Sequence, residues 1–333
     1  MPPISFHALR ITESADGQFS RQIVPRTTDE LPEGEVLIQV HFAALNYKDA
    51  LSSTGHKGVT RKFPHTPGID AAGLVASSTD PAFSEGDKVI VTGYDLGMNT
   101  DGGFGGYIRV PAEWVIPLPD TYTLEEAMVV GTGGFTAAIG LYKMEKQGQH
   151  PDQGPIVVSG ASGGVGSLAV GILAQAGYEV KAVTGKADAH EYLRTLGAKE
   201  ILGREDVDDN SGRPLLRPTW AGAIDTVGGN TLATLLKGCG RGGNVAACGL
   251  VASHKLDLTV YPFILNGVNL LGIDSATFPR AERLKVWQKL ANEWRVPQLD
   301  QIASHISLEE LDPYIEQILQ GKTRGRIIVK HQH

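Results

Sequence analysis

The clearest chemical signal in the sequence is a glycine-rich segment, Gly160-Ala-Ser-Gly-Gly-Val-Gly166, that directly follows the apolar run Ile156-Val-Val-Ser. Against the dinucleotide fingerprint G-x-G-x-x-G, Ala161 stands at the first glycine position, and Gly163 and Gly166 stand at the other two. Gly163 lets the backbone approach a pyrophosphate, and Gly166 lets the next helix pack closely on a sheet. Since a strand pattern precedes the segment and a helix pattern follows it, we predict that it binds a dinucleotide. The residues expected to contact the cofactor here are Ser162, Gly163, Gly164 and Val165.

The same segment also fits G-x-S-x-G, the nucleophile elbow of α/β-hydrolases, with Ser162 as the nucleophile. Asp225 and His254 follow it in the chain order that such an enzyme needs, but no H-G-G-G-type oxyanion loop precedes it. A plain packing turn in an α/β sheet is a third possibility. We expect dinucleotide binding. Replacing Ser162 by Ala separates the alternatives, because it would abolish hydrolysis but only weaken cofactor binding.

The end of the second expected strand indicates which dinucleotide is bound. NAD-binding folds usually carry Asp or Glu there, whereas this strand runs into Val183-Thr-Gly-Lys186, and Asp188 comes only in the next helix. A carboxylate would repel a 2′-phosphate, but Lys186 and Arg204 would attract it, unless both are ordinary solvated surface charges. We therefore predict NADPH as the cofactor. The residues expected in this part of the site are Thr184, Gly185, Lys186 and Arg204.

The elements around these residues follow a rhythm of strand, turn and helix from Pro155 onward. Strands are expected at 156–159, 179–183, 201–202, 222–227, 244–248 and 269–273, with helices at 164–176, 187–196 and 232–237. Buried strands that alternate with helices predict a doubly wound parallel sheet, an α/β fold. Earlier short β-like runs, at 36–40, 73–76, 88–92 and 107–110, lie too close together for crossover helices, which predicts antiparallel or mixed β structure.

A helical pattern over Leu124 to Lys143, interrupted by glycines, marks the change between these two regions. Residues after Ser275 hold helical patterns at 281–292 and 308–319 and a strand at 325–329, which do not extend the rhythm. We therefore expect a mostly-β domain over residues 1–127, completed by 276–333, and a cofactor domain over residues 128–275.

Composition limits the class of protein. A chain of 333 residues is longer than one hydrophobic core usually serves. Its net charge of −7 and its lack of long basic runs argue against a nucleic-acid or membrane partner. No stretch approaches ~18 uncharged apolar residues, and Met1 to Arg10 lack the apolar core of a signal peptide. Two cysteines are too few for a disulfide framework or a structural zinc lobe, so we expect a cytoplasmic protein.

Further motifs lie along essentially the whole chain. They are Asn46-Tyr-Lys-Asp49, Phe63-Pro-His-Thr-Pro-Gly-Ile-Asp-Ala-Ala-Gly-Leu-Val75, Gly86-Asp-Lys-Val-Ile90, Asp101-Gly-Gly-Phe-Gly-Gly-Tyr107, Gly131-Thr-Gly-Gly-Phe-Thr-Ala137, Tyr261-Pro-Phe-Ile264 and Leu271-Gly-Ile-Asp-Ser275. Together they resemble the medium-chain dehydrogenase/reductase family, in particular its quinone oxidoreductase-like YhdH/YhfP/AcuI group of acryloyl-CoA reductases. The resemblance implies a GroES-like mostly-β catalytic domain, a Rossmann cofactor domain with the cofactor in the intervening cleft, and usually a homodimer built through the cofactor domains.

The resemblance stops at the residues that hold zinc in the alcohol dehydrogenases of this family. The segment leading to Lys48 and Asp49 has no cysteine, and Gly68-Ile69-Asp70 stands where those enzymes carry Gly-His-Glu. We therefore expect no bound metal. Removing hydride from an alcohol is difficult without a Lewis acid, whereas reducing an activated C=C bond is easier, so the sequence favours an enone or enoyl-thioester reductase.

On this basis we expect NADPH-dependent reduction of a small-molecule substrate, acryloyl-CoA to propanoyl-CoA, by hydride transfer to the β-carbon. A broad quinone or enone reductase without a CoA preference is the main alternative, and a non-enzymatic NADPH-binding protein is a third. Tyr47 is the expected hydrogen-bond donor near nicotinamide and substrate, and either Tyr47 or water would protonate the α-carbon. Asn46 would orient the substrate carbonyl or the nicotinamide.

The resemblance also implies cofactor contacts outside the glycine segment. These are Tyr47, Thr132, Leu250, Ile264, Ser275 and Arg324, unless they serve only packing or surface charge. Lys57, Arg61 and Lys62 form a short basic loop in an acidic protein. Such a loop would suit the phosphates of CoA or be an ordinary solvated loop.

Overall fold

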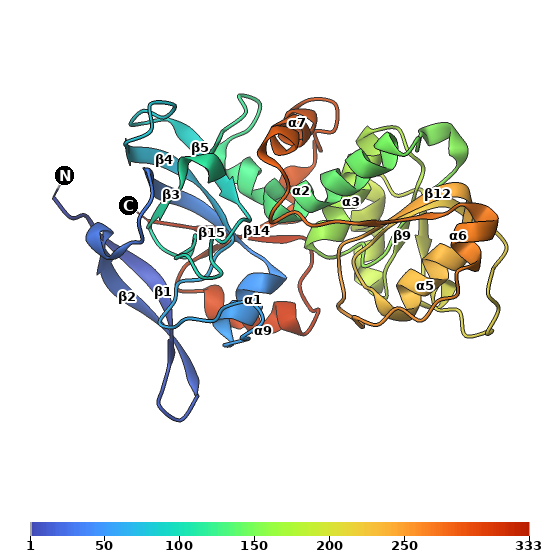
Figure 1. The fold of residues 1–333 in the computed structure, drawn as a ribbon, viewed down its shortest axis with the longest axis horizontal. Coiled ribbons are helices and arrows are strands. Elements are labelled where there is room, and N and C mark those ends of the chain that lie inside the picture. The colour runs from blue at the N-terminus through green and yellow to red at the C-terminus, as the bar shows by residue number, and fades with distance from the viewer. Residues whose placement is uncertain (1, 333) are drawn as a thin grey trace. The chain divides into compact units, whose positions relative to one another are not determined.

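The computed structural model describes residues 2–332 and divides the chain into two units (Figure 1). Unit 1 comprises the residues up to Thr132, Ala276–Leu284 and the residues from Ala303 onward, and unit 2 comprises Gly133–Ser275 and Lys285–Ile302. The sequence pattern suggests the first domain for this last segment. It lies in unit 2 because Trp287 stacks on Phe135, with ring centroids 6.0 Å apart, and Val296 packs against Gly171.

Unit 1 is built on a mixed, mostly antiparallel sheet. Its strands are β3 (Val36–Leu45), β4 (Asp70–Ser78), β5 (Lys88–Thr92), β6 (Tyr107–Val110), β7 (Ile116–Pro117), β14 (Ala303–Ser307) and β15 (Arg326–Lys330). They follow the order β14-β15-β3-β4-β5-β7, with β6 also paired to β3, and only β14 and β15 pair in parallel. Val36, Ile38 and Val40 contribute to the buried core of this sheet. The prediction of antiparallel or mixed β structure is confirmed.

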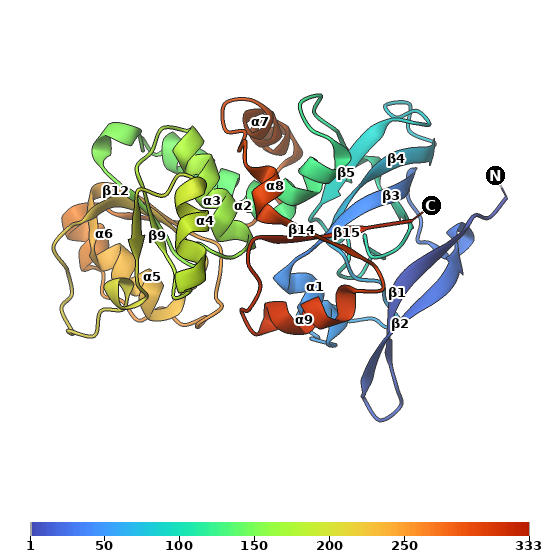
Figure 2. The ribbon, with the colours of Figure 1, turned by 180° about the vertical axis from the view of Figure 1, so that it is seen from behind.

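A hairpin and two neighbouring helices complete the part of unit 1 that concerns the site. The hairpin joins β1 (Ser5–Glu13) and β2 (Phe19–Thr27). Helices α1 (Tyr47–Ser53) and α9 (Leu311–Leu319) lie side by side (Figure 1 and Figure 2), with Ala50 and Ile315 in one apolar cluster. Neither the hairpin nor α1 is among the elements that the sequence pattern predicts.

Helix α2 (Leu124–Lys146) is broken at the boundary between the units. Gly131 has φ 43° and ψ −155°, a conformation that suits glycine and few other residues. The interruption that the glycines predict therefore lies at Gly131 alone, and the helix resumes at Thr132. Two further helices are α7 (Arg280–Ala291) and α8 (Leu299–Ile302).

Unit 2 contains a six-stranded parallel sheet. Its strands are β8 (Ile156–Val158), β9 (Val180–Val183), β10 (Glu200–Leu202), β11 (Trp220–Asp225), β12 (Cys239–Ala247) and β13 (Asn269–Gly272). The order is β10-β9-β8-β11-β12-β13, so the chain reverses its direction of travel between β8 and β11. This is the doubly wound Rossmann order, which confirms the predicted fold class.

Crossover helices cover both faces of this sheet. They are α3 (Gly164–Gln175), α4 (His190–Thr195), α5 (Gly229–Lys237) and α6 (Tyr261–Asn266). Right-handed crossovers place α3 and α4 on one face and α5 and α6 on the other. Because all strands run the same way, the segments that follow them meet at one edge of the sheet, where ligands bind in such folds. Within residues 2–332, no helix combines the length and apolar character needed to cross a membrane.

Candidate active site

The glycine segment forms the turn between β8 and α3, as the fingerprint requires. Gly163 caps α3, which begins at Gly164. A Cβ atom at position 166 would lie 2.3 Å from the carbonyl oxygen of Gly160, so α3 can start this close to the strand only with glycine there. A Cβ atom at position 163 would have one atom within 4 Å, the same oxygen at 3.3 Å, so the rest of its surroundings are open. The open side of Gly163 fits the close approach of a pyrophosphate.

Ser162 in this turn is tied to the end of β9. The Thr184 hydroxyl donates to Ser162 Oγ at 3.2 Å and accepts from the Lys186 amide at 3.1 Å. Ser162 and Thr184 are both buried. The structure thus brings together three residues that the sequence assigns to one cofactor site, although 22 positions separate the two hydroxyls.

Arg204, which follows β10, lies across the backbone of Gly185. A Cβ atom at position 185 would be 2.6 Å from Arg204 Nε and 3.1 Å from Cζ. The guanidinium therefore occupies the space in which any other residue would carry its side chain. The carboxylate of the exposed Asp206 accepts from the Gly203 amide at 2.8 Å. The end of β9 is a cationic position, suited to a 2′-phosphate, where NAD-binding folds carry an acid.

The hydrolase alternative requires Ser162, Asp225 and His254 to act together, and their contacts do not support this. Asp225 Oδ1 accepts from the Ser159 hydroxyl at 2.6 Å, and its carboxylate also accepts from the backbone amides of Val227 and Gly228. Burial raises the pKa of Asp225 above its ordinary value. His254 is exposed, and Ser162 bonds to Thr184. Asp225 therefore fixes the turn after β11 and does not orient a histidine.

The other cofactor contacts implied by the resemblance in unit 2 fall on later elements. Leu250 follows β12 at the same edge of the sheet, with 61% of its surface exposed. Ser275 follows β13, and its hydroxyl accepts from Thr136 Oγ1 at 2.8 Å. Ile264 is 68% exposed on α6, which leads to the opposite edge, where β13 begins.

In unit 1, Asn46 lies at the centre of a buried polar cluster. Its side-chain N–H groups donate to Asp70 Oδ2 at 2.9 Å, to Ala44 O at 3.1 Å and to Asp49 Oδ2 at 3.2 Å. Its Oδ1 accepts from Arg326 Nη1 at 2.8 Å. With both N–H groups engaged inside the protein, Asn46 is suited to hold its neighbours in place and has no N–H left for a substrate carbonyl.

Asp49 joins the start of α1 to the chain before β4. Its carboxylate accepts from the backbone amides of Asn46, Gly68 and Ile69 at 2.7, 3.1 and 2.8 Å. Complete burial and the neighbouring Asp70 carboxylate raise the pKa of Asp49 to about 7. The side chain that opens a helix as a capping residue therefore also titrates near neutral pH.

Asp70 and Arg326 close the cluster. Asp70 accepts from the Thr132 hydroxyl at 2.6 Å and from the Thr132 amide, and it pairs with Arg326 Nη2 at 3.1 Å. A Cβ atom at Gly131 would lie 2.6 Å from Asp70 Oδ2 and 2.7 Å from Arg326 Nη2. The glycine break in α2 thus lets the second half of the helix begin directly on this carboxylate. Thr132 is the residue that the resemblance places near the cofactor. Here its hydroxyl and its amide both donate to Asp70.

Tyr47 is the exposed residue of this region. It is the first residue of α1, its surface is 37% exposed, and its hydroxyl has no partner among residues 2–332. Arg324, the arginine selected from the sequence, is exposed, whereas Arg326 is buried in the cluster. Sequence reasoning missed Asp49, Asp70 and Arg326 as functional residues. The spacing of Asn46 and Asp49, three apart at a helix start, is the one signal that points to part of the cluster.

The donor set of this cluster does not fit zinc. Among residues 2–332 no group of three His, Cys, Asp or Glu side chains is arranged to hold a metal ion. The Asp70 oxygens already accept from Thr132, Asn46 and Arg326, and the Asp49 oxygens accept from backbone amides. The polar atoms at this position therefore satisfy one another.

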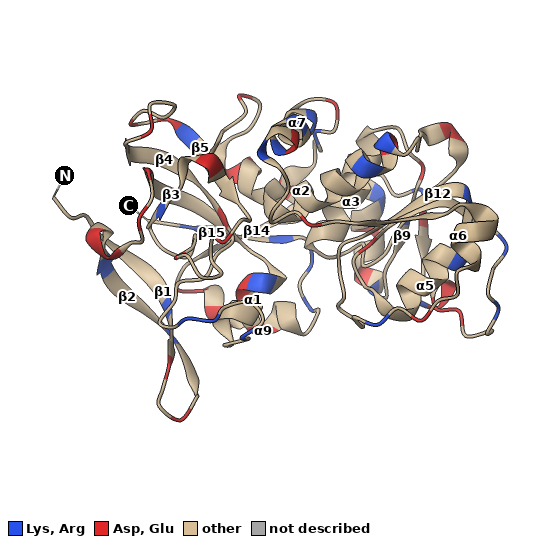
Figure 3. Ribbon diagram, in the orientation of Figure 1, with Lys and Arg blue, Asp and Glu red and all other residues tan. Residues whose placement is uncertain are grey.

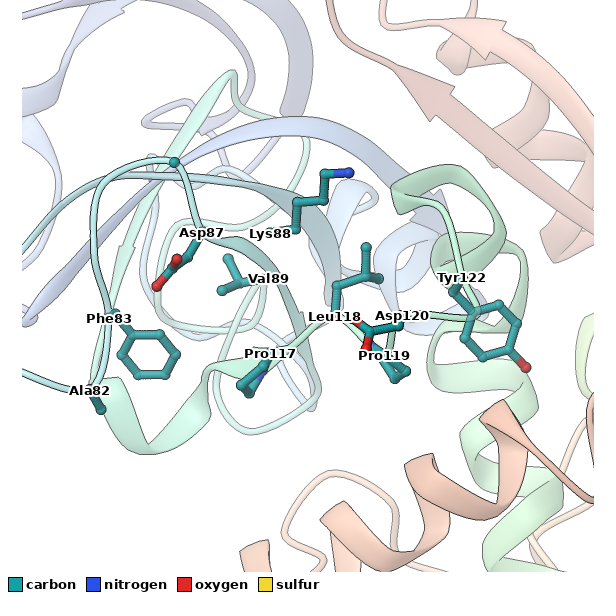
Figure 4. Close-up of a pocket in the computed structure, with 11 residues that line it drawn as sticks. Ala82, Phe83, Asp87, Lys88, Val89, Pro117, Leu118, Pro119, Asp120 and Tyr122 are labelled. Atoms are coloured by element: carbon teal, nitrogen blue, oxygen red, sulfur yellow. The ribbon is translucent and has the colours of Figure 1, made fainter.

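A pocket of about 460 Å³ lies elsewhere in unit 1, beside β5 (Figure 4). Its lining includes Phe83, Asp87, Lys88, Leu118 and Tyr122. None of the residues that the sequence assigns to substrate or cofactor contributes to it. The Asp87 carboxylate accepts from the Ser84 amide at 2.8 Å and so shapes the turn before β5.

Comparison with known families matches both units. Residues 32–120 match the alcohol dehydrogenase GroES-like domain, and residues 164–292 match the zinc-binding dehydrogenase domain. These matches agree with the β-rich unit 1 and the parallel sheet of unit 2.

Individual proteins resemble the chain over nearly its whole length. YhfP of Bacillus subtilis, whose name assigns it to the quinone oxidoreductases, is 45% identical over 98% of both chains. Its structure with NAD bound has a TM-score of 0.96 and covers 98% of this chain and 100% of that one. The yhdH oxidoreductase of Salmonella enterica in complex with NADP gives 42% identity and a TM-score of 0.94, with 98% and 100% covered. Acrylyl-CoA reductase AcuI of Ruegeria pomeroyi is 41% identical over 97% of this chain and 98% of its own. The chain therefore belongs to the medium-chain dehydrogenase/reductase family of oxidoreductases, in the quinone oxidoreductase-like group that contains YhfP, YhdH and AcuI.

Proposed function

We propose that this protein uses NADPH to reduce activated C=C bonds and that its substrate is acryloyl-CoA, which it converts to propanoyl-CoA. The observation that carries the cofactor choice is the Arg204 guanidinium lying across Gly185, beside Lys186 and with no acid from Thr184 to Lys186. Relatives have been crystallised with either NADP or NAD, so the choice for this chain rests on its own residues.

The residues of unit 2 divide the binding of the dinucleotide between them. The open turn at Gly163 and the free amides at the start of α3 suit the pyrophosphate. The buried hydroxyls of Ser162 and Thr184 suit the adenosine ribose, and Lys186 and Arg204 suit its 2′-phosphate. When bound, NADPH supplies the hydride that the β-carbon of the substrate accepts. Leu250, Ile264, Ser275 and Arg324 remain proposed contacts.

Residues of unit 1 serve the substrate. As the β-carbon accepts hydride, negative charge develops on the thioester oxygen and needs a hydrogen-bond donor. The Tyr47 phenol is exposed and has no partner within residues 2–332, so it is available for that role. Asn46, Asp49 and Arg326 act as positioning residues, since their mutual hydrogen bonds fix the first turn of α1, from which Tyr47 projects. Tyr47 or water then protonates the α-carbon.

Two experiments test this function. The first measures KM for NADPH and for NADH in Lys186→Asp, with the exposed Lys199→Asp as a control for charge. NADPH binding should weaken far more than NADH binding in the first variant and not in the control; equal effects on both cofactors would reject the 2′-phosphate assignment. The second compares NADPH oxidation with acryloyl-CoA and with simple quinones. If the protein turns over neither acryloyl-CoA nor quinones, the reductase function is rejected and only cofactor binding remains.

A broad quinone or enone reductase is the second candidate function, favoured by the 45% identity to YhfP. It shares the cofactor site and the donor Tyr47, and it differs only in its indifference to CoA. Equal kcat/KM for acryloyl-CoA and for a small enone would establish this alternative.

We also propose a homodimer formed through unit 2. Strand β13 is the last in its sheet and pairs only with β12 among the described residues. Apolar side chains nearby in sequence are exposed, including Tyr261, Leu265 and Leu270. A second copy of this edge would cover them. Sedimentation at micromolar concentration should show a dimer for the native chain and a monomer for Leu270→Glu; a native monomer would reject the proposal.

A further inference from the structure

A basic loop follows α1 directly. Residues 54–62, Thr-Gly-His-Lys-Gly-Val-Thr-Arg-Lys, contain three cations and no acid in a chain whose net charge is −7. Lys, Arg, Asp and Glu are spread over both units of the molecule (Figure 3). A local excess of positive charge on an acidic protein indicates an anionic ligand.

Buried contacts hold the basic loop in one conformation. The hydroxyls of Ser52 and Thr60, both fully buried, lie 2.6 Å apart. Gly55 has φ +80°, and a Cβ atom there would lie 2.3 Å from the Phe19 ring, so that ring packs directly on the loop backbone. The Arg61 amide donates to Asn99 Oδ1 at 3.2 Å. A loop fixed in this way loses little further entropy when it binds a ligand.

The three cations have different surroundings. Lys57 Nζ lies 2.5 Å from Glu13 Oε2 and stands over the rings of Phe19 and Phe63, at 5.1 and 4.8 Å from their centroids. Lys57 therefore holds the loop against Glu13 and the two rings. Arg61 and Lys62 are exposed, and their side chains pair with no acid among residues 2–332.

The acids that contacts connect to the basic loop, Asp95 and Glu13, are already engaged. Asp95 Oδ1 accepts from Asn99 Nδ2 at 3.0 Å and Asp95 Oδ2 accepts from the Thr100 hydroxyl at 2.9 Å. Glu13 is paired with Lys57. Two adjacent, uncompensated cations remain on a rigid support, and a guanidinium next to an ammonium is a combination that binds phosphate.

Tyr47 and the basic loop lie at opposite ends of α1. Helix α1 has seven residues, so its length is about 10 Å at 1.5 Å per residue. Tyr47 stands at its beginning and the basic loop starts at its end. In an acyl-CoA the reacting thioester and the nucleotide phosphates are likewise held apart by the extended pantetheine arm. The cofactor phosphates have their own residues in unit 2, at Gly163, Lys186 and Arg204.

Building on the proposed reductase function, we infer that Arg61 and Lys62 bind the phosphates of the CoA moiety and so determine the preference of the enzyme for CoA thioesters. Lys57 positions the loop and does not touch the ligand. Arg61 and Lys62 thus have a binding role only, and the chemistry belongs to the residues around Tyr47.

The test compares two thioesters of one acid. Acryloyl-CoA carries the nucleotide, and acryloyl-N-acetylcysteamine lacks it. In the double variant Arg61→Glu/Lys62→Glu, KM for acryloyl-CoA should rise at least about tenfold, because each site loses a charge-assisted phosphate contact. Values of kcat, KM for the truncated thioester and KM for NADPH should change less than about twofold. The control Lys199→Glu/Arg217→Glu makes the same change in net charge at two exposed, unpaired cations of unit 2 and should leave all four constants unchanged.

Other results would overturn the inference in distinguishable ways. If the native enzyme shows the same KM for both thioesters, the loop does not recognise CoA, although the reductase function stands. A rise in KM for NADPH in the double variant would show that the cations serve the cofactor instead. Calorimetric titration with free CoA covers the case in which no acceptor is reduced. Binding by the native chain that is lost in the double variant would support the inference even then, and no binding by the native chain would reject it.

Discussion

Asp70 Oδ2 and Arg326 Nη2 lie 3.1 Å apart, although 256 residues separate them along the chain. Both side chains are buried, at 0% and 3% exposure. Through this pair, strand β4 at the front of the chain is joined to strand β15 near its end, and Thr132 attaches the resumed helix α2 to the same carboxylate. Residues 2–332 of this medium-chain dehydrogenase/reductase contain no zinc ligand set, and a fully satisfied ion pair organises the corresponding part of unit 1.

Replacing Arg326 by Met should destabilise the protein strongly. The change leaves the Asp70 carboxylate buried without its counter-charge, which costs about 3–5 kcal/mol when one partner of a buried pair is removed. Urea denaturation of the two proteins measures the loss in the free energy of unfolding. Arg21→Met is the control, because Arg21 pairs with Asp312 and Glu316, whose side chains are at least half exposed, and such pairs contribute at most about 1 kcal/mol. Equal losses in the two variants would contradict a special role for the buried pair.

Asp49 should make stability fall as pH rises. Its pKa in the folded state is about 7, above its ordinary unfolded value, so between roughly pH 4 and pH 7 the folded chain holds a proton that the unfolded chain has released. Over that window the contribution of Asp49 to the free energy of unfolding decreases by about 1.4 kcal/mol per pH unit. Asp49→Asn cannot titrate. The difference in unfolding free energy between native and variant proteins, measured in urea at pH 5 and pH 7, should therefore shift against the native protein by about 2–3 kcal/mol; a constant difference would place the titration elsewhere.

Gly185→Ala tests the path of Arg204. An alanine Cβ would lie 2.6 Å from Arg204 Nε, so the guanidinium must move away from the end of β9. We expect KM for NADPH to rise about tenfold, equivalent to about 1.4 kcal/mol, with KM for NADH little changed. Gly272→Ala serves as the matched control, since a Cβ at that position meets no atom within 4 Å. A parallel rise for both cofactors would show that position 185 matters for the adenosine in general.

Tyr47→Phe tests the donor that the substrate oxygen needs. Loss of the phenol should lower kcat for acryloyl-CoA at least about tenfold, because a positioned donor or general acid contributes that much or more. KM for NADPH should stay the same, as the ring is retained. Tyr314→Phe on α9 provides the comparison for a general loss of a tyrosine hydroxyl. An unchanged kcat in Tyr47→Phe would leave water as the proton source and remove Tyr47 from the chemistry.

The two thiols should be unreactive in the folded protein. Burial raises the pKa of Cys239 and of Cys248 to about 12, and Cys248 also donates to the Asp225 carbonyl oxygen at 3.2 Å. At pH 8 almost no thiolate is present, so alkylation by iodoacetamide should be roughly a thousandfold slower than in the urea-unfolded chain. Mass spectrometry counts the adducts. Labelling of either cysteine at the unfolded rate would mean that its strand opens readily.

Local patterns predicted much of this fold. The strands at Lys88–Thr92 and Tyr107–Val110 have the predicted bounds, and the turn at Gly163 and Gly166 joins a strand to a helix as the fingerprint requires. Each of these features depends on side chains close together in sequence, through alternation, turn residues or a helix start. The fold class followed from the spacing of such segments.

Features that depend on distant partners were not predictable in this way. Arg326 is buried against Asp70, whereas Arg324 is exposed. The residues that flank the two arginines in the sequence do not distinguish them. Helix α1 has only seven residues and is held by contacts with α9, so its own sequence carries no helical period long enough to detect. The segment 285–302 joins unit 2 through the packing of Trp287 and Val296, which no window of sequence reveals.

The ion pair between Asp70 and Arg326 also imposes an order on synthesis. Asp70 leaves the ribosome 256 residues before its partner is made, and at roughly 5–20 residues per second that interval is on the order of 10 to 50 s. During this time the nascent unit 1 lacks β14 and β15, and Asp70 has no counter-charge. The uninterrupted stretch Gly133–Ser275 of unit 2 meanwhile emerges complete. The Rossmann sheet should therefore acquire structure first, and the catalytic unit, although it begins earlier in the chain, should be the last to close.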